Sequence, residues 1–178
     1  MSPPEVWLRG ALPDIAPVLQ PAAHSFLQVR EELERLLPPL SAAEAWTAPP
    51  GGAATVGFHV LHLAGATDRL LTYARGEPLS PEQRVRLVAE SAMPDPRPDG
   101  PALLRDVRAA LDDAMRQLHA WSLRADEVLA VREVGRSRLP SSVLGLLMHA
   151  AEHAQRHAAQ VATTARIVRG LSLAASST

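Results

Sequence analysis

The sequence predicts an all-α protein: a four-helix bundle with short additional helices and an irregular segment before the last helix. Four long segments repeat apolar residues at intervals of three and four, which is the pattern of a helix with one buried face. Stretches rich in proline and glycine separate these segments, and strand-like sequence is confined to residues 122–138. A chain of 178 residues can build one domain with its own core. We therefore expect a single domain over residues 1–178.

The first part of the chain is predicted to hold an outer arm, one long helix and one helical turn. Residues 1–16 contain three prolines and form the arm. The first long helix covers about residues 17–37, where apolar residues recur at helical spacing until two prolines stop it. Ser41 and Glu44 form a capping-box pair, which predicts a short helical turn that reaches Trp46.

The second long helix is predicted between Thr55 and Arg75. Thr55 is a favourable N-cap, and Gly76 is a favourable stop. A short helix follows over residues 80–90, because its first residues Ser-Pro-Glu-Gln combine an N-cap, a proline at the first position and a capping glutamine.

The third long helix is predicted over residues 101–121, after a proline-rich loop. Residues 122–138 are the least helical part and are expected to form short extended pieces. The fourth long helix is predicted to begin at residues 140–142 and to end at Gly170, and the tail of residues 171–178 is expected to fray.

Composition excludes several classes of function. Eighteen Lys and Arg oppose nineteen Asp and Glu, so there is no electrostatic argument for binding nucleic acid or an anionic membrane. The chain has no cysteine, which excludes disulfides, thiolate ligands and a cysteine nucleophile. Its first residues do not have the pattern of a signal peptide, and no apolar run approaches the ~20 residues of a membrane span. We expect a cytoplasmic protein with no nucleic-acid or membrane partner.

Three of the seven histidines, His149, His153 and His157, fall within nine positions of the last predicted helix. Steps of four residues keep side chains near one face of a helix, and two histidines four residues apart can bind one metal ion. The same spacing also fits a polar seam of histidines that are hydrogen-bonded to neighbouring helices. A third ligand from another helix is needed to decide between the two.

His59 and His62, on the second predicted helix, are the candidates for that third ligand. They lie three residues apart, and their spacing does not choose between them. Three neutral imidazoles suit zinc, nickel or another divalent first-row metal, and they leave positions open for water or substrate. A closed structural site usually has four protein ligands, so three histidines favour a reactive site.

Two segments resemble the signature sequences of the DinB/YfiT-like metalloenzyme family. Residues 56–68 are similar to its second-helix signature, in which a histidine is followed by a small apolar pair and later by an acidic residue. Residues 148–160 are similar to its fourth-helix signature, in which a His-x-x-x-His pair leads into Arg-Gly-Gln. The resemblance covers roughly residues 17–169. It implies a DinB-like bundle whose metal ligands are His62, His153 and His157.

The chain departs from the second signature at one place. Ala158 and Ala159 stand where the family has Arg-Gly, while Gln160 is kept. The departure leaves the ligands untouched, but it puts in doubt any role that the arginine has in contacts with a substrate or partner.

Four further residues are candidates for positions next to a ligand or in the cavity around it. His149 either lines the cavity or hydrogen-bonds to a ligand, with plain packing as the alternative. For His59 packing is the favoured interpretation, and a contact with ligand or substrate is the alternative. The full set is His149, His59, His24 and Gln160.

The resemblance implies a metal-dependent enzyme without naming a catalytic residue. Relatives include thiol-dependent transferases and isomerases, in which the metal activates a low-molecular-weight thiol such as bacillithiol, mycothiol or glutathione. A chain without cysteine is compatible with a nucleophile that the cofactor brings. The alternatives are a metal-dependent hydrolase and a non-catalytic metal-binding or structural dimer. We expect a homodimer with a small-molecule substrate, whereas the neutral charge argues against direct contact with DNA.

Overall fold

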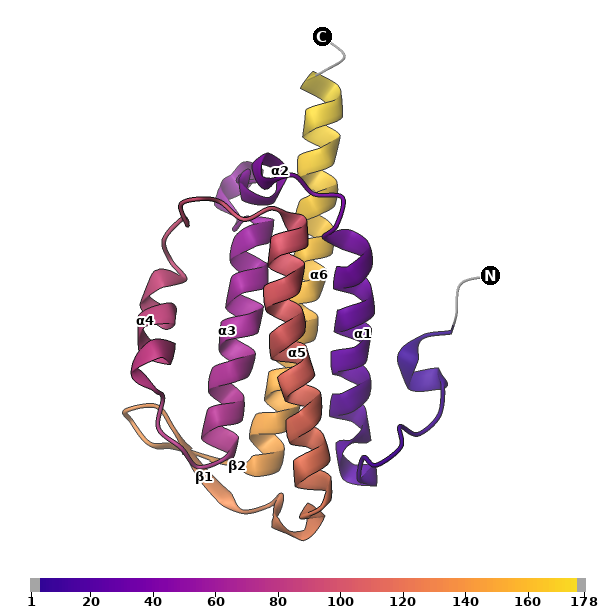
Figure 1. Cartoon of the computed structure of the whole chain (residues 1–178), viewed down its shortest axis with the longest axis vertical. Helices are drawn as coiled ribbons and strands as arrows, with labels where there is room; N and C mark the ends of the chain where they lie inside the picture. The colour runs from indigo at the N-terminus through magenta and orange to yellow at the C-terminus, as the bar shows by residue number, and fades with distance from the viewer. Residues whose placement is uncertain (1–3, 176–178) are drawn as a thin grey trace.

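Four long helices lie side by side in the computed structural model, which describes residues 4–175 and the side chains of residues 4–171 (Figure 1). α6 packs against both α1 and α3, and α3 also packs against α5. The predicted all-α bundle is therefore confirmed. Its helices are α1 Gln20–Leu36, α2 Ala42–Trp46, α3 Val56–Ala74, α4 Pro81–Ala89, α5 Gly100–Ser122 and α6 Val143–Ala175, with 3-10 turns at Val6–Leu8, Pro17–Leu19, Pro50–Gly52 and Ala125–Glu127.

The helices begin at the capping residues that the sequence indicates. The hydroxyl of Thr55 accepts a hydrogen bond from the backbone N–H of Phe58 at 3.1 Å, which satisfies a free donor at the start of α3. Ser41 and Ser80 each form a complete capping box, at the starts of α2 and α4. Gly76 has a φ of 80° and ends α3 as expected.

Each of the four long helices contributes fully buried side chains to one core. Phe26, Leu63, Leu111 and Leu147, one from each long helix, have no exposed surface. Removing such side chains from water is the main force that holds the bundle together, at roughly 25 cal/mol for each Å² of apolar surface.

α4 stands apart from the bundle at the outer side of α3 (Figure 1). Most of its residues are exposed, including Val85 and Val88. Its buried residue Gln83 donates a hydrogen bond to the hydroxyl of Thr72 at 2.7 Å and so ties α4 to α3.

The irregular segment before α6 contains a small antiparallel hairpin. β1, Val131–Val134, pairs with β2, Leu139–Ser142, so the expected extended pieces are present. Residues 140–142 belong to β2 and do not start the last helix, because their backbone pairs with β1. α6 begins one residue later, where the Ser142 hydroxyl accepts the backbone N–H of Gly145 at 3.0 Å.

The other end of α6 also differs from the prediction. α6 does not end at Gly170 but continues to Ala175. A glycine stops a helix when it takes a left-handed conformation, as Gly76 does, and Gly170 keeps a helical backbone instead. The tail expected over residues 171–178 therefore begins as helix, and residues 176–178 lie outside the described part. Within residues 4–175, no helix combines the length and the apolar character needed to cross a membrane.

Candidate metal centre

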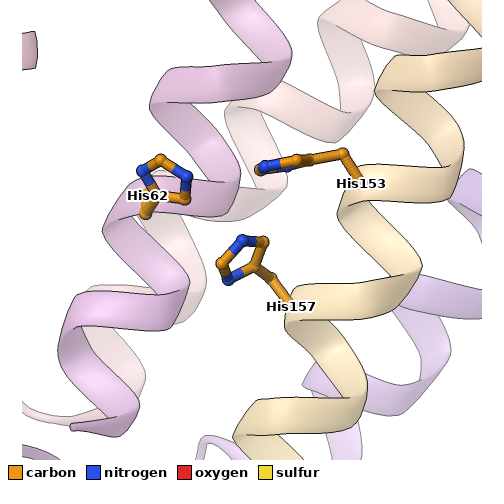
Figure 2. A group of neighbouring side chains, drawn as sticks. All are labelled: His62, His153 and His157. Carbon is orange, nitrogen blue, oxygen red and sulfur yellow. The ribbon is translucent and has the colours of Figure 1, made fainter. Parts of the chain in front are cut away.

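His62 from α3 meets His153 and His157 from α6 where the two helices pack together (Figure 2). One ring nitrogen of each histidine lies within 4.8 Å of the others. The ring centroids are 5.2 Å apart for His62 and His153, and 4.7 Å apart for His62 and His157. Those of His153 and His157 are 4.5 Å apart. The structure thus brings together the three residues that the family resemblance selects.

Small buried residues of α6 directly follow the three histidines of this helix. Ala150, Ala154 and Ala158 are fully buried and follow the same four-residue spacing as the histidines, one position further along the chain. Ala158, where the chain departs from the family signature, is thus part of the packed helix surface.

His62 is held by a buried carboxylate. Its Nδ1 lies 2.8 Å from Oε2 of Glu90, the residue that caps the end of α4. An ionised carboxylate can only accept a hydrogen bond, so Nδ1 carries the proton and Nε2 is left with its lone pair. In Figure 2 one nitrogen of the His62 ring points toward the side chains of His153 and His157. Arg69 pairs with the same carboxylate from the next turns of α3.

His59 is in contact with His157. The Nδ1 atoms of the two rings are 3.1 Å apart, so one ring donates a hydrogen bond and the other accepts it. His59 is buried, with 6% of its surface exposed. The structure therefore places His59 against a candidate ligand as a hydrogen-bonding partner, and the favoured interpretation of plain packing was incomplete.

The surroundings of His59, His153 and His157 lower the pKa of each ring. Burial lowers the pKa of His157, and together with the nearby rings of His153, His62 and His59 and the cation of Arg156 it brings this pKa to about 4. Burial is also the largest cause of the lowered pKa values of His153 and His59. Neutral imidazoles are the form that binds a metal ion, because a protonated nitrogen has no lone pair to offer.

The donor set fits a divalent metal ion. Nδ1 of His153 is buried without a hydrogen-bond partner among the described residues. A buried polar atom that stays unpaired costs about 1–3 kcal/mol, which a cation or a water molecule in the cluster would offset. The side chain of His62 is 27% exposed, so the cluster also has access to solvent.

The other sequence candidates lie further from the cluster. His149 stands with its ring centroid 5.8 Å from that of His153, but its Nδ1 faces Glu152 at 3.1 Å and its side chain is half exposed. His24, a candidate for reaching the site from the first helix, contacts the N-terminal arm instead. Its Nε2 lies 2.9 Å from the carbonyl oxygen of Gly10, in the N-terminal arm. Gln160 is exposed.

Glu90 and Arg69 are the two site residues that sequence reasoning missed. Arg69 had a local signal, because it lies seven residues after His62, two helical turns further along the same face. Glu90 had none: it is 28 residues away from His62 in the chain, at the end of a helix whose position only the tertiary structure defines.

A cavity of about 650 Å³ lies between α3, α4 and α5. Its lining includes Glu90, Gly65 and Asp68, together with apolar side chains such as Leu61 and Ala110. None of the three clustered histidines lines this cavity, but Glu90, which does, also bonds to His62.

Comparisons with known proteins agree with this architecture. A crystal structure of a conserved protein from Enterococcus faecalis has a TM-score of 0.61 with this chain at 18% sequence identity. The likeness covers 86% of this chain and 98% of that one, and at this identity it shows the fold alone. No match was found among curated proteins. The model of the DinB superfamily matches residues 25–161, which is most of the chain and includes all three clustered histidines. The chain therefore belongs to the DinB superfamily.

Proposed function

We propose that His62, His153 and His157 together bind one divalent metal ion, with zinc or nickel as the best candidates. The observation that carries this proposal is the convergence of three ring nitrogens within 4.8 Å of one another. The lowered pKa values of His153 and His157 support it, because burial disfavours the protonated form of both rings and only the neutral form binds a metal. Imidazole ligands suit both metals, and the choice between them depends on geometry and supply.

We further propose that the protein is a thiol-dependent transferase or isomerase. When bound, a divalent ion supplies Lewis acidity, which lowers the pKa of a thiol or water that coordinates to it. Three protein ligands leave room for such a molecule, and the exposed edge of His62 gives it access. The chain has no cysteine, so the reacting sulfur has to come from a small-molecule thiol. The cavity beside Glu90 supports a small-molecule substrate.

The residues around the cluster have supporting tasks in this proposal. Glu90 holds the proton of His62 on Nδ1, and His59 shares a proton with Nδ1 of His157. Both contacts fix the direction of a candidate ligand, and the bond to Glu90 leaves Nε2 of His62 with its lone pair. Nε2 of His157 has its lone pair when His157 is the donor in the bond to His59.

Metal content is the first test of the proposal. Elemental mass spectrometry on the untagged protein should find close to one divalent ion per chain, and His153→Ala should lose it. His119→Ala is the control, because His119 bonds to the carbonyl oxygen of Asp14, away from the cluster. Folded protein that stays metal-free after supply of zinc, nickel and manganese would contradict the proposal, and so would equal loss in both variants.

Turnover separates the candidate activities. The metal-loaded protein should accelerate the attack of bacillithiol, mycothiol or glutathione on an aryl chloride, in which the thiolate sulfur replaces chloride. Acceleration of ester hydrolysis without any thiol would favour a hydrolase instead. If the protein accelerates neither thiol transfer nor ester hydrolysis, the non-catalytic alternative is favoured. The expected homodimer stays a prediction, which sedimentation of the full chain tests.

A further inference from the structure

We propose that Glu90 is a positioning residue, which fixes the tautomer and the direction of His62 for metal binding. The proposal rests on the metal site proposed above, and it assigns a task to a short helix that otherwise stands outside the bundle. Glu90 follows the last residue of α4 and reaches back to α3, so α4 contributes to the cluster without carrying a ligand.

The contacts of the Glu90 carboxylate define this arrangement. Oε2 lies 2.8 Å from Nδ1 of His62 and 3.2 Å from Nη2 of Arg69, and Oε1 bonds to Nη1 of Arg69. The side chains of Glu90 and Arg69 are only 10% and 11% exposed. Arg69 alone would be enough to neutralise the carboxylate. The additional bond to His62 is what connects the ion pair to the candidate metal site.

A glycine makes room for the carboxylate. Gly65 lies on α3 between His62 and Arg69, and a Cβ atom at this position would overlap Oε1 of Glu90. The same Cβ would lie 2.8 Å from Nη1 of Arg69, which is also too close. Glu90 therefore rests directly on the helix backbone, and any side chain at position 65 has to displace it.

Side-chain contacts with α3 hold α4 in the position from which Glu90 reaches His62. Near the start of α4, Gln83 bonds to Thr72, and further along Arg86 pairs with Asp68 at 3.3 Å. Both partners are on α3, the helix that carries His62. α3 thus holds α4, and α4 in turn places Glu90 beside a histidine of α3.

Zinc affinity and cobalt spectra test the proposal on the full-length protein. Glu90→Ala should weaken zinc binding about 10–100-fold in competition with a chromophoric chelator, as loss of a carboxylate behind a metal-bound histidine does elsewhere. Gly65→Ala should shift the affinity in the same direction. Glu90→Gln, which keeps the acceptor oxygen but not the charge, should recover part of the loss. The ligand-field spectrum of bound Co²⁺ should change in Glu90→Ala, which a merely structural role would not require.

Glu152→Gln is the matched control, because Glu152 also bonds to a histidine and an arginine but stands at His149, outside the cluster. Its zinc affinity should stay within twofold of the wild type. If folded Glu90→Ala and Gly65→Ala also bind zinc within twofold and keep the wild-type cobalt spectrum, the proposal is wrong. If Glu90→Ala does not fold, Gly65→Ala and Glu90→Gln decide by the same criterion.

A measurement without metal separates this proposal from the metal site itself. Nitrogen-15 NMR of the metal-free protein should find His62 protonated at Nδ1, and Glu90→Ala should shift it toward a mixture of tautomers. If the wild type binds no metal, the proposed function is wrong. A change of the His62 tautomer in Glu90→Ala would even then support Glu90 as the group that orients His62. The same mixture in wild type and variant would overturn the positioning role.

Discussion

Two glutamates of this protein each bond to a histidine and an arginine, but in different surroundings. Glu90 contacts His62 and Arg69 in the interior, where its side chain is 10% exposed. Glu152 contacts His149 and Arg156 on the outer face of α6, where its side chain is 53% exposed. The bonding partners are of the same kind, and burial and position differ. Of these two glutamates, Glu90 alone joins two helices, and for this reason we assign the positioning role to Glu90 and not to Glu152.

The geometry of the two arrangements explains the contrast. Glu152 bonds to residues three and four positions away on its own helix, a local pairing that helices provide readily. Glu90 instead joins α4 to α3 across 21 to 28 residues of chain. Water and salt screen the exposed pair, whereas the buried groups depend on each other.

The largest expected difference is in metal content. His62→Ala should abolish stoichiometric zinc, because two histidines from one helix remain and the ligand from α3 is gone. His149→Ala should retain zinc, because its Nδ1 faces Glu152 and its side chain is half exposed. Elemental analysis after dialysis measures both. Loss of zinc in His149→Ala would place His149 among the ligands and contradict its assignment outside the cluster.

The next largest difference is in the free energy of unfolding. Glu90→Ala leaves the buried Arg69 of α3 without its counter-charge, which should cost about 3 kcal/mol. Glu152→Ala should leave the midpoint of urea unfolding unchanged within error, because exposed pairs contribute little. Equal destabilisation of the metal-free variants would show that burial does not distinguish the two glutamates.

A smaller effect should appear in the pH dependence of the metal-free protein. The folded-state pKa of His157 is lowered to about 4, so between about pH 6.5 and this value the unfolded chain binds more protons than the folded one. Stability should therefore fall as the pH drops through this range and level off below it. His157→Ala should have a shallower slope in urea unfolding at several pH values. An unchanged slope would mean that the surroundings of the His157 ring do not oppose its protonation.

The predictability of this protein from its sequence follows the same division between local and long-range contacts. Caps such as Thr55 and Ser80 act within one helical turn, so the helix starts they predict are found in the structure. Gly170 was wrongly predicted to end the last helix, because its helical conformation depends on its surroundings. Residues 140–142 were wrongly predicted to start that helix, because only the tertiary structure pairs them with β1.

The residues of the candidate site also fall into those that local spacing indicates and those that only tertiary packing defines. The spacing of His153 and His157 indicates a shared face, but only the family resemblance favoured His62 over His59. The structure places both of these near the α6 histidines, with His59 as a hydrogen-bonding partner of His157. Glu90 was not predictable, because its place beside His62 is defined by the packing of α4 on α3.

Anomalous diffraction from crystals of the zinc-loaded protein can show whether a divalent ion binds between α3 and α6. Data collected on both sides of the zinc edge should give one strong peak per chain, bonded to His62, His153 and His157. The Nδ1 atom of His62 should still face Glu90. A peak bonded to other residues, or no peak at this cluster at saturating zinc, would contradict the proposed metal site.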